Sequence, residues 1–129
     1  MANQFVVQLK NDPGSMATLA EALAARGVDL RAIGGGGIGN SGHVIMTTAD
    51  DATTKAVLDE GGYVYVEGES ILAEVDDKPG GMARLSRALA DAGVNIYGHL
   101  FLGRWGDRAM FAFVVDKPEV ARPILERKG

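Results

Sequence analysis

The chain has 129 residues, a formal net charge of −4 and no cysteine. The lack of cysteine excludes disulfides, thiolate nucleophiles and thiolate metal sites, and an acidic chain without a Lys/Arg run argues against nucleic acid as a partner. Hydrophobic residues make up 47% of the sequence, which is enough for a packed core, yet no apolar run reaches transmembrane length. Met1 to Gln4 lacks the basic start of a signal peptide, so we expect a cytoplasmic protein with no membrane partner.

The first half of the chain predicts six elements in the order βαββαβ. Phe5, Val7 and Leu9 alternate with Gln8 and Lys10 and predict a strand over 5–10. After a break at Pro13-Gly14, apolar residues at helical spacing predict a helix that ends at Gly27. The remaining elements are a strand at 28–33, a glycine-rich turn at 34–42, a strand at 43–48, a helix from Asp50 or Asp51 to Glu60, and a strand at 63–67. This order is the split βαβ arrangement of ferredoxin-like folds.

The second half predicts strands at 71–75, 94–102 and 108–115, a helix at 81–92, and a last helix after 115. Asp116 and Glu119 form a D-x-x-E pattern that predicts a capping box for the last helix, and Pro123 within it predicts a kink or a restart. The sequence ends at Gly129, where a fourth strand would begin, so we expect this half to lack its last strand. The sequence leaves open which half the strand at 63–67 joins.

The two halves repeat each other at an offset of 66 residues. Between Leu9–Leu30 and Val75–Ile96, 10 of 22 positions are identical, where chance would give about one to three. A repeat of this length indicates a small domain duplicated within one polypeptide, not a solenoid unit. We therefore predict an α+β protein of two tandem ferredoxin-like (βαββαβ) units with antiparallel sheets, over residues 1–68 and 69–129.

Two short motifs recur at this offset. The first is the turn before the first helix of each half, Asp12-Pro13-Gly14 and Lys78-Pro79-Gly80. It is either a plain strand-to-helix connection or an anion site, because the first N–H groups of a helix, at Gly14, Ser15 and Met16, are free to bind a carboxylate. The second motif is a Gly-Val pair followed by Asp29 or Asn95 at the start of the next strand. A polar residue in that place indicates a group that faces a specific partner.

The glycine run from Gly34 to Gly42 matches G-x-G-x-x-G but is followed by a strand-like segment instead of a helix. We therefore interpret it as a flexible hairpin loop, able to act as a flap over a ligand, and not as a dinucleotide site. His43 and His99 occupy non-equivalent repeat positions and have no acidic or His neighbour at ligand spacing, which favours surface or interface roles. No serine lies in a nucleophile-elbow context.

The strand, the D-x-P-G-type turn, the amphipathic helix and the G-V-[DN]-[LI] start of the next strand together resemble the ACT domain of amino-acid-metabolism regulators, in both halves. The resemblance implies that a ligand's carboxylate and amine meet the loop after the first strand and the polar residue that opens the second. The residues that it places there are Asn11, Asp12, Gly14, Ser15, Met16, Asp29 and Leu30, and in the second half Asp77, Lys78, Gly80, Gly81, Met82, Asn95 and Ile96. Leu9 and Val75 stand where serine-sensing members carry His, so serine specificity does not transfer.

The function indicated is a regulatory protein that binds a small amino acid and acts in trans on an enzyme or pathway of amino-acid metabolism. No catalytic residue, metal site or cofactor is expected, and the enzyme partner stays unidentified. Two alternatives remain open. One is a small α+β enzyme with a pocket on the open sheet face, using Tyr97 and His99, and the other is an interaction module without a ligand.

Strict alternation along 94–102 puts Val94, Ile96, Leu100 and Leu102 on one face and Asn95, Tyr97, His99 and Phe101 on the other. The strand at 108–115 is apolar on both faces, and the helices cover one face only. An uncovered apolar face marks an interface, so we predict a homodimer through the open sheet face, with Tyr97, Phe101 and the Trp105 loop in the contact.

Overall fold

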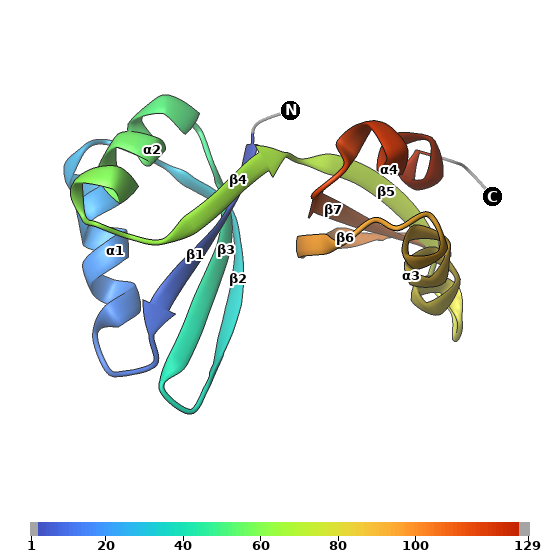
Figure 1. The fold of residues 1–129 in the computed structure, drawn as a ribbon, viewed down its shortest axis with the longest axis horizontal. Helices are drawn as coiled ribbons and strands as arrows, with labels where there is room; N and C mark the ends of the chain where they lie inside the picture. Colours follow the sequence, from blue (N-terminus) through green and yellow to red (C-terminus); the bar gives the residue numbers. More distant parts are fainter. Residues whose placement is uncertain (1–2, 127–129) are drawn as a thin grey trace. The chain divides into compact units, whose positions relative to one another are not determined.

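A computed structural model describes residues 3–126, and the chain divides into two compact units whose boundary lies between Gly68 and Glu69. We call them the first unit and the second unit. The first unit is built from β1 (Asn3–Lys10), α1 (Ser15–Ala25), β2 (Leu30–Ile38), β3 (Ser41–Thr48), α2 (Asp51–Glu60) and β4 (Tyr65–Glu69). Its four strands form a sheet in the order β2-β3-β1-β4, and both helices lie on one face of that sheet (Figure 1).

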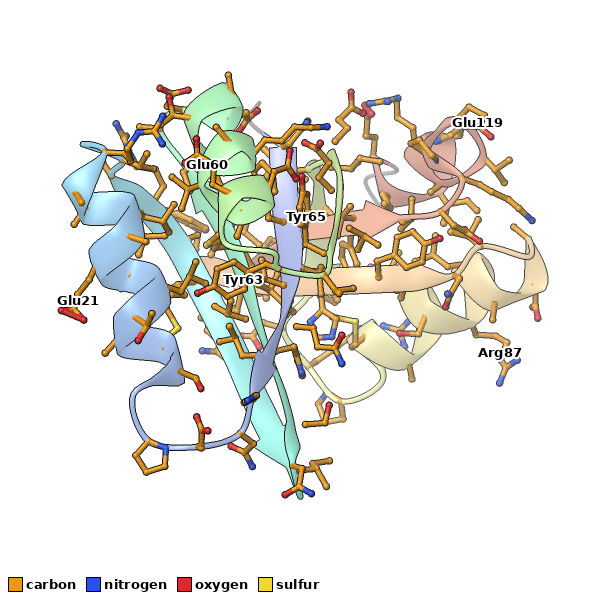
Figure 2. The ribbon with its side chains drawn as sticks, turned by 60° about the vertical axis from the view of Figure 1, so that its left-hand side comes forward. Glu21, Glu60, Tyr63, Tyr65, Arg87 and Glu119 are labelled. Atoms are coloured by element: carbon orange, nitrogen blue, oxygen red, sulfur yellow. The ribbon has the colours of Figure 1, made fainter. Side chains whose placement is uncertain are left out.

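The core of the first unit lies between the sheet and its two helices. Phe5 and Val7 of β1 are fully buried against Leu19 and Leu23 of α1 and against Leu58 of α2. The opposite face of α1 is exposed and rich in alanine, and Glu21 on it points away from the sheet (Figure 2). Alternation along β1 and helical spacing along α1 thus give each element one apolar face, and these faces pack together to form the core.

The second unit repeats this plan with one strand fewer. It contains β5 (Ile71–Asp76), α3 (Gly81–Asp91), β6 (Ile96–Trp105), β7 (Arg108–Val115) and α4 (Pro118–Leu125), and its sheet order is β5-β7-β6. Ile71, Phe113 and Val115 of the sheet pack against Leu89 of α3 and Leu125 of α4. No helix between residues 3 and 126 is long and apolar enough to cross a membrane.

The predicted α+β class with two antiparallel sheets is confirmed. The strand that the sequence could not assign, predicted at 63–67, is β4 at Tyr65–Glu69, and it lies beside β1 in the sheet of the first unit. The backbone N–H of Gln8 donates to the carbonyl of Val64 at 2.9 Å just before that strand begins. Among residues 69–126 the sheet has three strands, so β5 is an edge strand where its counterpart β1 is not.

The prediction of a glycine-rich loop at 34–42 was wrong. β2 continues through the glycines to Ile38 and pairs with β3 residue by residue, so that Gly35 lies opposite Val44 and Gly37 opposite Gly42. The turn itself is limited to Gly39 and Asn40, and Gly39 has a positive φ of 60°. Glycine is a weak strand former by itself, but here the partner strand β3 supplies the backbone hydrogen bonds.

The prediction of the two faces of β6 was also wrong. The ladder between β6 and β7 shifts register between Ile96 and Gly98 and again between Phe101 and Gly103, and each bulge changes the alternation of side chains. His99 and Phe101 therefore lie opposite Phe113 and Phe111, on the face that packs against the helices. The opposite face carries Leu100 and Ala112 instead, and both are buried, whereas Phe101 is 50% exposed. Phe101 is thus not part of an open-face contact.

The predicted capping box of the last helix was wrong as well. The residue before α4 is Lys117, and no side chain caps this helix. The Asp116 carboxylate instead accepts a hydrogen bond from the backbone N–H of Asn95 at 2.8 Å, which ties the start of β6 to the end of β7. Pro118 in the first turn needs no donor there, so the helix begins without the box.

Candidate functional site

The two turns that precede α1 and α3 have the same backbone geometry. Gly14 and Gly80 have φ angles of 91° and 92°, a left-handed conformation that glycine adopts without strain. In the first unit the Ser15 hydroxyl donates to the Asp12 carboxylate, so the turn is closed by side chains as well as by backbone. In the second unit Gly81 replaces Ser15, and a Cβ there would overlap the carbonyl oxygen of Asp76. The two turns therefore share one backbone conformation but differ in the residue that follows the left-handed glycine.

A hollow of about 350 Å³ lies beside the turn of the first unit. Its walls come from the end of β1, the turn, the first residues of α1, and the facing strands β2 and β3. The residues that line it are Leu9, Lys10, Asn11, Asp12, Ser15, Met16, Ile33, Gly34, Gly35, Gly36, Gly42, His43 and Val44. Polar groups from the turn thus face an apolar floor, and the glycines of β2 keep one wall free of side chains.

Asn11 is held across the glycine hairpin. Its side-chain Nδ2 donates to the carbonyl of Gly39 at 2.9 Å, and its backbone N–H donates to the carbonyl of Asn40 at 3.2 Å. A Cβ at Gly37 would overlap the Asn11 side-chain oxygen. The absence of a side chain at Gly37 therefore lets Asn11 lie at the rim of the hollow with its orientation fixed.

The backbone donors of the turn are partly in use. The Ser15 N–H approaches the Asp12 carbonyl at 3.5 Å, and the Gly81 N–H donates to the Lys78 carbonyl at 3.1 Å. In helix geometry the amides of the next residues in the first turn have no partner within the helix, which leaves Met16 and Met82 as the predicted donors.

A second hollow, of about 760 Å³ and wider, lies on the other side of the same turn. Pro13 and Gly14 line it together with Thr18, the hairpin at Asn40 and Ser41, and Gly61 to Val64. Asp12 and Ser15 border both hollows. Because Asn11 and Met16 line the smaller hollow and not this one, the smaller hollow gathers more of the predicted ligand-binding residues.

The structure does not bring Asp29 and Leu30 to this hollow within the first unit. Leu30 pairs with Thr48 at one end of the sheet, whereas Gly36, opposite His43, lies six residues further along β2, or about 20 Å at the usual rise of a strand. Asp29 is exposed and forms an ion pair with Arg31, with 3.1 Å between Oδ2 and Nε. Leu30 packs against the core of the first unit.

The corresponding residues of the second unit are also spread along its sheet. Asp77 forms an ion pair with Arg104 at 2.7 Å, and Lys78 approaches Asp76 at 3.9 Å. Met82 and Ile96 are partly buried against the core, and Asn95 is exposed at the start of β6. A hollow of about 200 Å³ in this unit is lined at the turn by Val75, Asp76, Gly81 and Arg84, and Asp77 is not among its lining residues.

Sequence reasoning missed several residues of the smaller hollow, namely Ile33, the glycines of β2, and His43. Because the glycine run was interpreted as a loop, its residues were not expected to line the hollow. The signal available was that Gly34, Gly35 and Gly36 follow an apolar strand without any turn-forming Pro, Asn or Asp among them. A stretch of glycines in a strand marks a place where another group approaches the backbone closely.

The groups with shifted pKa values lie away from this hollow, at the corner between α2 and β4. A hydrogen bond from Tyr65 to the Asp59 carboxylate, at 2.7 Å, raises the pKa of the Tyr65 phenol. The ion pair with Glu67 raises the pKa of Lys55, and hydrogen bonds from Thr53 lower the pKa of Asp50. Figure 2 shows Tyr65 beside α2. These groups stabilise the corner between α2 and β4. The polar side chains of the hollow are arranged in a way that suits the binding of a ligand.

Among residues 3–126 no group of three or more His, Asp or Glu side chains is placed to hold a metal ion. No protein-family model matches the sequence, and no curated protein matches it.

Solved structures do resemble the chain. It is similar to a protein from Bacteroides thetaiotaomicron (TM-score 0.70, 18% identity, 97% of this chain and 86% of that one). It is also similar to the regulatory subunits of aspartate kinase from Thermus flavus (TM-score 0.66, 17% identity, 97% and 91%) and from Thermus thermophilus (TM-score 0.57, 22% identity, 95% and 89%). At these identities the likeness concerns the fold, and it supports an ACT-like fold over nearly the whole chain.

Proposed function

We propose that the chain binds a small amino acid in the 350 Å³ hollow of the first unit and acts as a regulatory protein. The observation that carries this proposal is the gathering of Asn11, Asp12, Ser15 and the start of α1 around one small hollow. A hollow of this volume is at the low end for ligand pockets and suits a molecule with few heavy atoms.

The chemistry of the walls suits a zwitterion. The first turn of α1 offers backbone N–H groups and the positive end of the helix dipole to a carboxylate. The Asp12 carboxylate and the Asn11 side-chain oxygen are acceptors for an ammonium group. Leu9, Met16 and Val44 form the apolar floor against which a short aliphatic side chain would pack.

A regulatory role in trans, on an enzyme or pathway of amino-acid metabolism, is the second part of the proposal. It is supported by the ACT-like fold and by the regulatory subunits of aspartate kinase among the similar structures. We place this protein in the cytoplasm.

A homodimer completes the proposal. Asp29 lies at the far end of β2 from the hollow, so we propose that it reaches a bound ligand from another copy of the chain. If copies share the site in this way, ligand affinity should fall on dilution below the dimer dissociation constant, and Asp29→Asn should weaken binding without changing stability.

The test is a thermal-shift screen of the purified chain against the twenty amino acids at millimolar concentration. A ligand present at 100 times its dissociation constant should stabilise the fold by about 2.7 kcal/mol. Asn11→Ala should reduce this shift while the unliganded melting temperature changes little. Lys55→Ala, a change at an exposed residue away from the hollow, is the control. A wild-type protein whose melting temperature responds to no amino acid would contradict the proposal.

A further inference from the structure

The repeat allows each wall of the hollow in the first unit to be matched with a residue of the second unit. β2 corresponds to β6 at an offset of 66, and β3 corresponds to β7 at an offset of 67, because Phe5 lies opposite Met46 while Ile71 lies opposite Phe113. The matched pairs on one side of the bulge are Asn11 with Asp77, Gly35 with Phe101, and Val44 with Phe111. Beyond the bulge at Leu102 the offset along β6 becomes 67, so Gly37, opposite Gly42, matches Arg104, opposite Ala109.

The matched place in the second unit is occupied by side chains of the chain itself. The rings of Phe101 and Phe111 meet edge to face, with 5.5 Å between their centroids. The Arg104 guanidinium lies 4.8 Å from the centre of the Phe101 ring. Its Nε donates to the Asp77 carboxylate at 2.7 Å. In the first unit the equivalent residues are Gly35 and Gly37, neither of which carries a side chain.

We infer that the second unit is closed to the ligand by this cluster, Phe101, Arg104 and Asp77, so that each chain binds one amino acid, in the first unit. The inference rests on the proposed function. The guanidinium of Arg104 takes the partner position at Asp77 that a ligand's ammonium group would need. The Phe101 ring, which is 50% exposed, stands at the position where Gly35 leaves the first unit without a side chain.

The ring contributes more to this closure than the ion pair does. The side chains of Arg104 and Asp77 are 63% and 31% exposed, and ion pairs this open to solvent contribute little by themselves. The stacked ring and guanidinium are a steric obstacle in addition, and the contact between them strengthens as water is excluded. Removing Arg104 should therefore open the site in part, and removing the Phe101 ring as well should open it further.

Methionine methyl groups give a matched readout in the wild-type chain, since Met16 and Met82 occupy the same repeat position. The protein is labelled at its methionine methyl carbons and titrated with the amino acid that gives the largest thermal shift among the twenty. The expected result is a saturating change in the Met16 resonance, an unchanged Met82 resonance, and a calorimetric stoichiometry of one per chain. Equal changes at both methionines, or a stoichiometry of two, would overturn the inference and leave the proposed function standing.

Substitutions at Phe101 and Arg104 test whether these two side chains close the second unit to the ligand. Phe101→Gly with Arg104→Gly gives the second unit the residues of the first at these two positions, and it should raise the stoichiometry from one to two and move the Met82 resonance. Arg104→Ala alone and Phe101→Ala with Arg104→Ala decide the question if the double glycine variant fails to fold. Folded variants that still bind a single ligand would overturn the inference. A wild-type chain that binds no amino acid contradicts the proposed function and the inference together.

Discussion

The glycines of β2 differ from one another in what a side chain would meet. A Cβ at Gly35 would overlap the backbone carbonyl of His43, whereas a Cβ at Gly36 would meet nothing within 4 Å. Neither residue has a positive φ. The requirement for glycine at position 35 is therefore one of space, and position 36 has no such requirement.

Gly35→Ala and Gly36→Ala should change stability in opposite directions. Gly36→Ala restricts the unfolded chain at a site with room for the methyl group and should stabilise the protein by about 0.4–1 kcal/mol. Gly35→Ala forces β2 away from β3 and should destabilise by at least as much as such overpacking usually costs, about 1–3 kcal/mol. Urea unfolding of both variants beside the wild type gives the comparison, and equal effects would contradict it.

Asp50 caps α2 through two side-chain contacts. Its carboxylate accepts from the Thr53 N–H at 3.0 Å and from the Thr53 hydroxyl at 2.6 Å, and these bonds lower its pKa. A lowered pKa in the folded state means that the cap's contribution is complete above about pH 5 and is lost as the pH falls through the folded-state value.

Asp50→Asn should therefore flatten the acid limb of the stability curve while keeping much of the cap near neutral pH. Asp50→Ala should lower the melting temperature at every pH, because the Thr53 N–H loses its acceptor. Melting temperatures measured from pH 3 to pH 7, as a series for each variant, separate the two effects. A wild-type curve with the same acid slope as that of Asp50→Asn would show that other carboxylates set the slope.

Helix α4 shows how an element forms without the signals that usually mark it. It has no side-chain cap, Pro118 stands in its first turn, and Pro123 lies inside it. What fixes the helix is packing, since Ala121 and Leu125 are buried in the core of the second unit while Pro123 is exposed. The packing of one apolar face therefore outweighs the weak intrinsic helix preference of this segment.

Pro123→Ala should stabilise the second unit. The proline ring removes one backbone donor and crowds the carbonyl of Glu119, a defect that costs up to about 3 kcal/mol in a helix interior. Pro118→Ala is the control and should change little, because a proline in the first turn removes no helical hydrogen bond. Denaturant unfolding measures both, and a loss of stability in Pro123→Ala would indicate that the ring itself packs favourably.

The elements that the sequence predicted correctly are those with one strong periodicity. β1, α1 and α3 each present an apolar face at a single regular spacing. The glycine-rich part of β2 was not predicted as a strand. Glycine has a weak preference for strands, and pairing with β3 makes this segment a strand. The faces of β6 were predicted wrongly because two bulges, at Tyr97 and Leu102, reverse the alternation. The signal available was the glycine that follows each of them, Gly98 and Gly103, because a glycine inside a strand often marks a bulge.

On the scale of the whole molecule, the sequence predicted two like units and a second unit without its last strand, but not how the side chains around the two turns differ. The turn residues Asn11, Asp12, Ser15 and Met16 were placed at a site by their motif, and they do line one hollow. The resemblance assigned Asp29 and Asn95 to the same ligand as the turns, but these residues lie far from the turns along each sheet. Sequence spacing fixes which residues are equivalent, whereas only the register of the strands fixes which of them meet.

The two units should differ in their ability to fold alone. Units of about 65 residues bury a modest fraction of their surface and are marginally stable. The first has four strands, with β1 paired on both sides, whereas β5 in the second has an open edge among the described residues. A fragment of residues 1–68 should unfold cooperatively on heating, and a fragment of 69–129 should melt lower or remain unfolded. Circular dichroism of the two fragments checks the order, and the reverse order would contradict it.

The junction between the units has a consequence for how the chain tolerates change in length. β4 ends at Glu69 and β5 begins at Ile71, so Ser70 alone stands between two strands, and it is 3% exposed. Boundaries between domains usually fall in loops, where insertions and deletions do little harm. Here one added residue would slip a strand by one position and turn its buried side chains outward. The seam should therefore be among the least permissive places for insertions, and the hairpin at Gly39 and Asn40 among the most permissive.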